Sequence, residues 1–481
     1  MTGRLAFFYK LFLVLCSLIL TGCMVGPNYS RPATAANDPN GFVNADGHIT
    51  EANDFSALDH WWESFGDVTT AELVRQCLAN NYDLAAAAAR LLQAQASLEQ
   101  AHAALWPSIS YNLSRSRNKM SMDLGSMFGG GRFSVLTTTW TQEFSTSYVL
   151  DIFGKIRRAE RALLAQTLAV QANRQAMVNT LIATVVSARI NIAVIQHRLA
   201  ILQQNIESQQ KTLDIVQQRY SLGLVGPVDV SLAKETLASL KSVEPSLELA
   251  LTTARNAMDV LLARRPGKTP ELPMSLNALP DLPALPIGVP AGLIDRRPDI
   301  IAAEYSLRSA GEQVGVSVAQ MFPDLTLTGT YGFTSSNMED IFQKRDTEIY
   351  AAIVNLAQPI FDAGRLKAQV KAAKARYDEL AAGYASAVLN AIREVEDALV
   401  TERLLLEQLA QLQIRLEQAQ SAEQLSQQRY QSGAESILSV LESQRMSRSA
   451  KDDIIVVQGQ IWTARVNLYL ALGGDWEQKK E

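Results

Sequence analysis

Histidine is scarce in this chain, and the shortage limits the chemistry that the chain can perform. Only 4 of its 481 residues are histidines. They stand in different predicted elements, at His48, His60, His102 and His197. No residue spacing suggests a metal site, no glycine-rich loop joins a strand to a helix, and no nucleophile has a nearby base. The sequence therefore predicts no enzyme activity, no cofactor and no metal site.

Clustered positive charge and long apolar runs are also missing. The chain has 44 basic and 49 acidic residues, a net charge of −5, with no basic patch of the kind that binds nucleic acid. It is 47% hydrophobic. After the first 22 residues, however, no stretch of about 20 apolar residues suggests a membrane helix. If the chain crosses a membrane, we expect it to do so as strands.

The first 22 residues predict a cleaved signal peptide. Basic residues precede the apolar run Leu11–Leu20, which is too short to span a bilayer. The segment Leu20-Thr21-Gly22-Cys23 resembles a bacterial lipobox, so we expect Cys23 to be the lipidated first residue of the mature chain. Because Met24 and not Asp follows, the outer membrane is the expected location. The alternative is an ordinary signal peptide with an incidental cysteine.

Cysteine is nearly absent from the mature chain. The chain has 3 cysteines. Cys16 is lost with the signal peptide and Cys23 is acylated, so only Cys77 remains. No intramolecular disulfide can form. Lipidation at Cys23 anchors the chain to lipid of the outer membrane but does not make it span the bilayer.

Glycine and proline are absent from residues 155–218, and this stretch predicts one very long helix. Apolar residues recur in it every seven positions, at Val178, Val185, Ile192, Leu199, Ile206 and Leu213. A second apolar row follows three positions behind, with Gln209 as its one polar member. Such a heptad pattern indicates left-handed packing against other helices. An ordinary dimeric coiled coil would explain this helix alone but not its neighbours.

The segments before this helix alternate with a period of two, which predicts strands at about 106–118 and 134–152. Each has one apolar and one Ser/Thr-rich face, and a Gly-rich loop joins them. A helix at about 71–104 precedes them. After the long helix, glycines and Pro227 predict a tight turn, and Asp229 predicts the N-cap of a return helix at 229–264.

The same order of elements then recurs, which indicates an internal duplication. The predicted strands are at about 322–334 and 347–361, the long helix at 364–430 and the return helix at 436–472. The turn Gln427-Gln428-Arg429-Tyr430 matches Gln217-Gln218-Arg219-Tyr220 after an offset of 210 residues. The predicted domains are the signal peptide 1–22, an arm 23–69, a first repeat 70–265, a Pro-rich connector 266–297, a second repeat 298–473 and a tail 474–481.

The strands predict an assembly of several copies. Four strands cannot close a barrel, and open edges in lipid would leave backbone groups without hydrogen bonds. Barrels need at least about eight strands, so two copies are the minimum and three copies give twelve. Twelve strands leave a lumen, whereas eight would be filled by side chains. The fold class is thus mainly α with membrane β, a long α-helical coiled-coil tunnel plus a 12-stranded trimeric β-barrel, with an internal two-fold repeat.

Several short segments stand in a distinctive order along the chain. They are Cys23–Tyr29, Trp61-Trp62, Asp151–Gly154, Arg296–Ile300, Phe361–Arg365 and the two turns. In this order and spacing they resemble the TolC superfamily of outer membrane factors, in its NodT-type efflux lipoprotein branch, and the resemblance covers essentially the whole chain. It implies a homotrimeric duct that passes substrates from an inner-membrane pump and a periplasmic adaptor (membrane fusion) protein to the outside. The duct itself does no chemistry. Trp61-Trp62 is expected simply to pack the arm onto the body.

The resemblance also implies that the two turns form the periplasmic mouth of the tunnel, where the adaptor docks. We predict that this tip carries the gate and the adaptor contact. The residues are Tyr220, Gly223, Asp229, Tyr430, Gly433, Glu435 and Ser439. The TolC pattern has an Arg and an Asp where this chain has Glu435 and Ser439, so an Arg–Asp link that closes the gate is not predicted.

We hypothesise that Asp229 and Glu435 form a carboxylate ring that favours cations, because like charges around an axis repel each other and attract cations. The alternative is that both residues are helix caps at a solvated turn. A different class of protein, a coiled-coil lipoprotein that tethers without a pore, would explain Cys23 and the helices. It would leave the apolar face of the strands unexplained.

Overall fold

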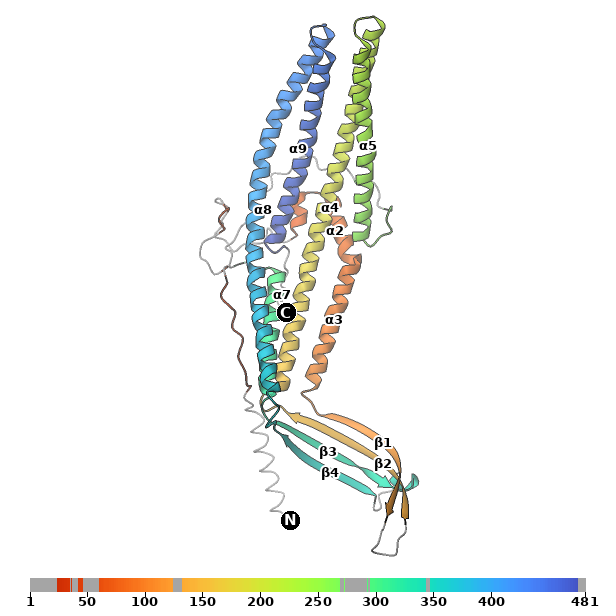
Figure 1. The fold of residues 1–481 in the computed structure, drawn as a ribbon, viewed down its shortest axis with the longest axis vertical. Helices are drawn as coiled ribbons and strands as arrows, with labels where there is room; N and C mark the ends of the chain where they lie inside the picture. Colours follow the sequence, from red (N-terminus) through yellow and green to blue (C-terminus); the bar gives the residue numbers. More distant parts are fainter. Residues whose placement is uncertain are drawn as a thin grey trace. The chain divides into compact units, whose positions relative to one another are not determined.

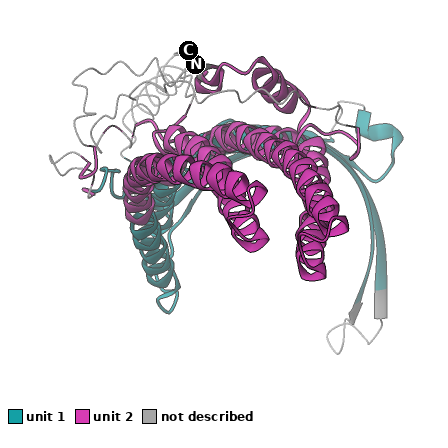
Figure 2. Cartoon of the chain, turned by 90° about the horizontal axis from the view of Figure 1, so that it is seen from above, with its two compact units in different colours: residues 1–32, 92–169, 304–383 teal, residues 33–91, 170–303, 384–481 magenta. Residues whose placement is uncertain are grey.

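The computed structural model describes residues 24–34, 36, 42–45, 60–123, 132–268, 272, 292, 295–342 and 347–474. The predicted signal peptide, Cys23, most of the connector and the C-terminal tail beyond residue 474 lie outside them. The chain forms two compact units (Figure 2). Unit 1 comprises residues 1–32, 92–169 and 304–383, and unit 2 comprises residues 33–91, 170–303 and 384–481.

The order of elements repeats once along the chain (Figure 1). The elements are η3 Trp61–Phe65, α2 Val68–Asn80, α3 Tyr82–Ala103, β1 Ser108–Asp123, β2 Arg132–Leu150, α4 Lys155–Ser221, α5 Pro227–Leu261, α7 Pro298–Ala319, β3 Asp324–Ser335, η4 Glu339–Phe342, β4 Glu348–Ala357, α8 Arg365–Gln431 and α9 Ile437–Ala471. Helices α4 and α8 have 67 residues each, and α5 and α9 have 35 each. The equal lengths show that the duplication extends to whole helices.

The heptad seams are buried, as the sequence pattern predicts. In unit 2, α4 buries Val185, Ile192 and Val216 completely. The polar seam residue Gln209 is also fully buried, and its Oε1 accepts a hydrogen bond from Arg448 on α9 at 3.2 Å. In α8, Tyr384 and Ala391 are fully buried seven positions apart, and Leu409 packs with Val457 and Ile461 of α9. Each long helix is therefore held by side-chain packing along its length, as a coiled coil requires.

Helix α4 departs from one expectation. Among the described residues, it is the one helix that contains an 18-residue window long and apolar enough to cross a membrane, with a mean hydropathy of 1.7. The expectation that no such stretch follows the signal peptide was therefore wrong. Of this window, 61% is buried inside the chain. Its apolar side chains serve as helix-packing core, which explains why composition alone resembles a membrane span.

The helix predicted at 71–104 is two helices, α2 and α3. The break lies at Asn81, whose backbone is extended. Its side-chain oxygen accepts hydrogen bonds from the backbone N–H groups of Asp83 at 2.9 Å and Leu84 at 3.1 Å, and its Nδ2 donates to the Leu261 carbonyl at 3.0 Å. Asn81 thus caps α3 and ties it to the end of α5, a long-range contact that the helical periodicity does not reveal.

The return helix α5 begins at Pro227 rather than at the predicted Asp229. Gly226 is its N-cap and has no side chain to cap with. Proline is well placed as the first helical residue, because its missing N–H would be unpaired there anyway. Asp229 lies inside the first turn, where a carboxylate favours the positive end of the helix dipole.

The four strands form one antiparallel sheet in unit 1, in the order β1-β2-β3-β4. The β2–β3 pairing joins the two repeats, with Phe144 opposite Tyr331. Strands β1 and β2 pair from Ser108↔Ser147 to Asp123↔Arg132. Strand β1 continues past its predicted end at 118 but begins after 106, and β2 begins before its predicted start at 134 but ends before 152. Strand β4 ends at Ala357, short of the predicted end at residue 361. This sheet and the paired long helices confirm the predicted fold class.

The Trp61-Trp62 segment packs as expected. It forms η3, and the Trp61 ring stacks on Tyr469 of α9 with 4.9 Å between centroids. Phe65 lies 4.9 Å from the ring of Trp462. Trp61, Trp62 and Phe65 are all buried. This aromatic cluster fixes the end of the arm to α9 within unit 2.

Candidate functional site

Both helical tips end in the same backbone turn. In the first, Gly223 has φ +70°, its N–H bonds the Tyr220 carbonyl at 2.9 Å, and Leu224 N–H bonds the Arg219 carbonyl at 3.0 Å. In the second, Gly433 has φ +78° and makes the equivalent bond to Tyr430 at 3.0 Å. These are Schellman turns, in which a left-handed glycine lets the last helix carbonyls find partners. The repeated glycines are explained by this geometry.

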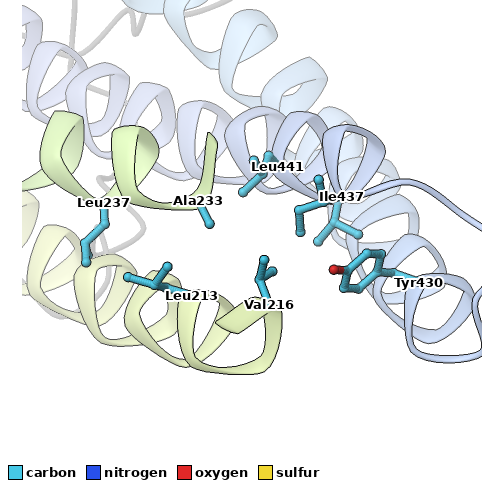
Figure 3. Close-up of a cluster of buried hydrophobic side chains, with 8 residues drawn as sticks. Leu213, Val216, Ala233, Leu237, Tyr430, Ile437 and Leu441 are labelled. Atoms are coloured by element: carbon cyan, nitrogen blue, oxygen red, sulfur yellow. The ribbon is translucent and has the colours of Figure 1, made fainter. Parts of the chain in front are cut away.

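The two tips of one chain share an apolar cluster in unit 2 (Figure 3). It unites four helices. Its buried members are Leu213 and Val216 of α4, Ala233 and Leu237 of α5, Tyr430 of α8, and Ile437, Val440 and Leu441 of α9. Figure 3 shows the Tyr430 ring directed toward Val216 and Ile437. The hairpins α4–α5 and α8–α9 are therefore held together at the level of their turns.

Arg219 links the first tip to the second. Its Nη1 donates to the backbone carbonyl of Tyr430 at 2.6 Å and to that of Gln431 at 3.4 Å. Its guanidinium carbon lies 4.6 Å from the centroid of the Tyr430 ring. A cation at the C-terminus of α8 gives its last carbonyls a charged hydrogen-bond donor and offsets the negative end of the helix dipole, and the ring adds a cation–π contact. This residue was not among the predicted site residues, although the repeated Gln-Gln-Arg-Tyr motif contains it.

The two predicted tyrosines have different environments. Tyr430 is 6% exposed, whereas Tyr220 is 48% exposed. The Tyr430 hydroxyl has no hydrogen-bond partner among the described residues. Burial raises the pKa of Tyr430, Arg219 lowers it, and the charge of Asp229 raises it further. The tip thus places Asp229 within electrostatic reach of a buried phenol.

Glu435 and Ser439 lie together in the second tip. The Ser439 hydroxyl donates to Oε1 of Glu435 at 2.9 Å, and Nε of Arg429 lies 3.6 Å from Oε2 of Glu435. The hydrogen bond from Ser439, the backbone N–H of Ser436 and the charge of Arg429 lower the pKa of Glu435, in that order. Glu435 is therefore held as an anion beside a cation of its own chain.

Neither proposed ring residue is a helix cap. The N-caps are Gly226 for α5 and Ser436 for α9, and the Ser436 side chain accepts from Ser439 N–H. The alternative in which Asp229 and Glu435 serve only as caps is therefore not what the structure shows. Asp229 lies in the first turn of its helix, and Glu435 precedes the cap of the other.

A groove of about 530 Å³ opens beside the tips in unit 2. Apolar residues such as Leu232, Leu240 and Leu438 line it from α5 and α9, along with charged residues that include Glu235 and Arg445. Leu438 is 62% exposed. Apolar side chains flanked by charges give a surface that a second protein could cover.

In unit 1, the residues next to Cys23 are held in a fixed position. Arg158 of α4 is only 1% exposed and donates to the carbonyls of Pro27 at 3.1 Å and Gly26 at 3.2 Å, and to Glu312 of α7 at 2.8 Å. A Cβ on Gly26 would come within 2.7 Å of Cα of Gly315. Gly26 of the Gly-Pro-Asn-Tyr motif is therefore required by close packing against α7, a role that the sequence did not reveal.

Glu304 of α7 secures the next part of this segment. Its carboxylate accepts hydrogen bonds from Tyr29 at 3.2 Å, Arg31 at 2.7 Å and Arg308 at 2.5 Å. Burial opposes ionisation of Glu304, but the hydrogen bonds from Arg31 and Arg308 outweigh burial and lower its pKa. Burial raises the pKa of Tyr29, and the charge of Glu304 raises it further. This part of the chain is thus anchored by a charge network centred on the buried carboxylate of Glu304.

The sheet in unit 1 has one apolar face that runs across all four strands. Strand register and alternation place its members together. They are Ile109, Tyr111, Leu113, Leu136, Trp140, Phe144, Tyr148, Leu150, Leu325, Leu327, Tyr331, Phe333, Tyr350, Val354 and Leu356. The other face is mainly Ser and Thr, although β4 adds Ile349 and Ile353 to it. Within the described residues, the edge strands β1 and β4 each pair on one side only.

The comparisons with known proteins agree with this architecture. The sequence model of the family described as "Outer membrane efflux protein" matches residues 73–264 and 289–474, which is most of the chain. The chain belongs to the outer membrane efflux protein family. It is an outer-membrane efflux channel protein, and the predicted resemblance is confirmed. The two matched segments correspond to the two halves of the duplicated chain.

Named relatives share the length of the chain. The pyoverdine export outer membrane protein OpmQ of Pseudomonas putida is 32% identical over 420 residues, covering 87% of this chain and 88% of the relative. The cation efflux system protein CusC of Escherichia coli is 28% identical over 471 residues, covering 96% and 98%. Among solved structures, the outer-membrane channel OprN has a TM-score of 0.85 and 30% identity, covering 94% of this chain and 99% of its own.

Proposed function

We propose that three copies of this chain close one outer-membrane exit duct and that it works with a periplasmic adaptor and an inner-membrane pump. The observation that carries the proposal is the four-stranded sheet, with its continuous apolar face and two edges that lack partners in the described chain. In lipid, each unpaired backbone group costs several kcal/mol, so β1 of one copy must pair with β4 of the next. Three copies give twelve strands and a lumen lined by the Ser/Thr face.

A coiled-coil tether without a pore is less consistent with these observations. It has no use for a sheet whose apolar side chains, such as Tyr350 and Val354, are 81% and 70% exposed. The named relatives are efflux channels and not enzymes. No group of three or more His, Cys, Asp or Glu side chains among the described residues could hold a metal ion.

We place the adaptor contact and the gate at the tips. The groove between α5 and α9, with its exposed Leu438, offers the docking surface. Tyr220 and Leu222 are exposed at the turn of the first tip and offer further contacts. Gly223 and Gly433 set the turns that present it. The contact between Arg219 and the Tyr430 carbonyl holds the hairpins of one chain together. Opening the mouth by separating these hairpins would have to break that contact.

Around the three-fold axis, Asp229 and Glu435 would supply repeated carboxylates that favour cations. Arg429 lies 3.6 Å from Glu435 and partly offsets its charge, so Asp229 is the stronger contributor. Replacing both residues by alanine should reduce cation selectivity in planar bilayers. Selectivity that stays at the wild-type value would remove the ring hypothesis and leave the duct intact.

We propose that the mature protein is lipid-anchored at Cys23 in the outer membrane, with a large periplasmic part. The anchoring of Gly26 and Pro27 by Arg158 supports a fixed starting point for the chain beside the sheet of unit 1. The relatives are named for pyoverdine, toluene and cation efflux, so this family is not tied to one cargo. We infer that the pump selects the substrate.

The decisive experiment is native mass spectrometry of the detergent-extracted particle. Three protein copies, each with a lipidated Cys23, are expected. A Cys23→Ser variant separates the anchor from the assembly, because it removes the lipid and leaves the strand edges unchanged. A monomer or dimer would remove the twelve-stranded duct and favour the tether.

A further inference from the structure

The apolar face of the sheet changes character along β1. Ile109, Tyr111 and Leu113 alternate on this face, and the next positions on the same face are Arg115, Arg117 and Lys119. All three cations are exposed. A strand whose lipid-facing side passes from apolar to basic marks the boundary between hydrocarbon and headgroups.

The position of the change along the strand agrees with the thickness of a membrane. Strand β1 begins at Ser108, next to the end of α3, so its first residues are at the periplasmic side of the sheet. Arg117 lies 9 positions further along. At about 3.4 Å per residue and a tilt of about 40°, this is a rise of roughly 23 Å, close to the ~25 Å apolar band of such barrels. In the proposed barrel, Arg117 and Lys119 would therefore lie at the level of the outer leaflet headgroups.

Arg115 lies at the boundary itself. Its guanidinium carbon is 5.2 Å from the centroid of the Trp140 ring on β2, the residue with which it pairs. Tryptophan is enriched at membrane interfaces, and a long basic side chain there extends its charge toward water. The contact with Trp140 therefore holds Arg115, the first in the row of three cations, at this boundary.

Nothing acidic pairs with this row in the described part of the chain. Thr138 and Leu136 are the β2 partners of Arg117 and Lys119. No salt bridge among the described residues involves Arg115, Arg117 or Lys119, and the acidic residues Glu339 and Asp340 are on η4. Within their own described chain, these three neighbouring cations therefore have no counter-charge, which leaves them available to an anionic ligand.

We propose that Arg115, Arg117 and Lys119 form a binding site for the phosphate groups of an outer-leaflet lipid headgroup. The acyl chains of that lipid would cover the apolar face beside Leu113, and its phosphates would accept hydrogen bonds from the cations. This inference rests on the proposed membrane barrel. In addition to that barrel, it proposes a site that selects a lipid by the charge of its headgroup rather than by the length of its acyl chains.

The test is a titration of the full-length trimer in detergent with diphosphoryl lipid A, read by native mass spectrometry. Its control ligand is the same lipid after removal of its phosphates. The variant Arg117→Gln with Lys119→Gln leaves the Arg115–Trp140 contact in place. Each cation near a charged surface contributes about fivefold, so the double variant should bind about 25-fold more weakly. Arg117→Lys keeps the charge and should bind like the wild type.

A matched control removes the same kind of charge elsewhere. Lys234→Gln with Lys241→Gln neutralises two exposed lysines of α5 and should leave lipid binding unchanged. Two results would overturn the proposal. One is that the wild type binds the lipid equally well with and without its phosphates, and the other is that the affinity of the double variant stays within twofold of the wild-type affinity. Competition by inorganic phosphate at equal concentration would assign the row to a free anion instead. The same spectra report the number of protein copies. A trimer that no longer binds the lipid would therefore concern this site alone, whereas loss of the trimer would concern the proposed duct.

Discussion

The two helical tips of this chain have nearly the same sequence and the same turn, yet they differ in what the turn residues do. In the first tip, Arg219 reaches across to the other hairpin and Tyr220 is exposed. In the second, Tyr430 is buried in the shared cluster and Arg429 stays within its own tip, beside Glu435. Duplicated residues have thus become complementary, because the first tip provides the cation and the second provides the ring and the carbonyls that receive it.

This division teaches that a sequence repeat conserves local structure but not long-range partners. The Schellman turn depends on a glycine and on backbone bonds within a few residues, so both copies form it. The contact between Arg219 and Tyr430 depends on which hairpin lies beside which. If the two tips were equivalent, both arginines would contact the other hairpin or neither would. Because the tips differ, each chain forms one such contact, from Arg219 of the first tip to Tyr430 of the second.

The largest expected effect is at the tyrosines. Tyr430→Ala should lower the free energy of opening of the tips by about 3 kcal/mol, because it empties a buried position. Tyr220→Ala should change it by less than about 0.5 kcal/mol, because that ring is exposed. Hydrogen exchange of peptides that cover both turns measures this free energy. Equal effects at the two positions would contradict the proposed asymmetry.

A control separates the ring from its hydroxyl. Tyr430→Phe keeps the buried ring and removes a hydroxyl that has no partner among the described residues. It should therefore be neutral or slightly stabilising. A large loss of protection in this variant would show that the hydroxyl has a partner in the assembled protein.

The arginines should show the next largest difference. Arg219→Ala removes charged hydrogen bonds to the end of α8 and should cost about 1.5 kcal/mol. Arg429→Ala removes an ion pair whose arginine is 57% exposed and should cost at most about 0.5 kcal/mol. The same exchange experiment compares them, and Arg219→Lys tests whether charge alone suffices. If Arg429→Ala had the greater effect, the assignment of the two roles would be reversed.

The glycines should behave alike, which sharpens the comparison. Gly223→Ala and Gly433→Ala each place a side chain at positive φ and should cost about 1 kcal/mol. Near Gly433, an added Cβ would meet Nη2 of Arg219 at 3.8 Å, which is an ordinary contact. Exchange rates at the two turns should therefore rise by similar factors. A tenfold difference between them would show that the turns are not equivalent.

The smallest effect is on the titration of Tyr430. Its pKa is above the ordinary 10.0 in the folded chain, so the folded state retains this proton longer than the unfolded state. Stability is therefore full below pH 10 and falls as the pH rises further. The tyrosinate absorbance of the wild type minus that of Tyr430→Phe isolates this group. Asp229→Asn should bring its pKa down, and Arg219→Ala should raise it, because the two charges act in opposite directions.

Much of the fold could be predicted from particular residues. The heptads of α4, the alternation of the strands and the turn glycines all act locally, so each indicated its element. The burial of Gln209 is consistent with its place in the seam. The start of α5 was missed by two residues, since Asp229 has the composition of a cap while Gly226 occupies the position. The break at Asn81 was missed because its partner, the carbonyl of Leu261, is distant in sequence.

The candidate site was predicted less completely. The repeated motif indicated the turns and included Tyr430. It placed Arg219 and Arg429 at equivalent positions, so it could not show that only Arg219 contacts the other hairpin. Likewise, Gly26 and Pro27 were visible as a motif, whereas their partner Arg158 is one of many basic residues of a helix. A charged residue acquires its role from the group that it meets, and that group is rarely nearby in the chain.

By itself, the sequence determined the periods of the helices and strands, the duplication and the turns, because these follow from backbone geometry and from apolar residues spaced along one element. Only the tertiary structure decided that Arg219 caps α8, that Tyr430 fills the shared cluster and that Arg115 meets Trp140 at the end of an apolar face. Those contacts join residues far apart along the chain or on different strands. Their free energy depends on the distance and burial that packing alone sets.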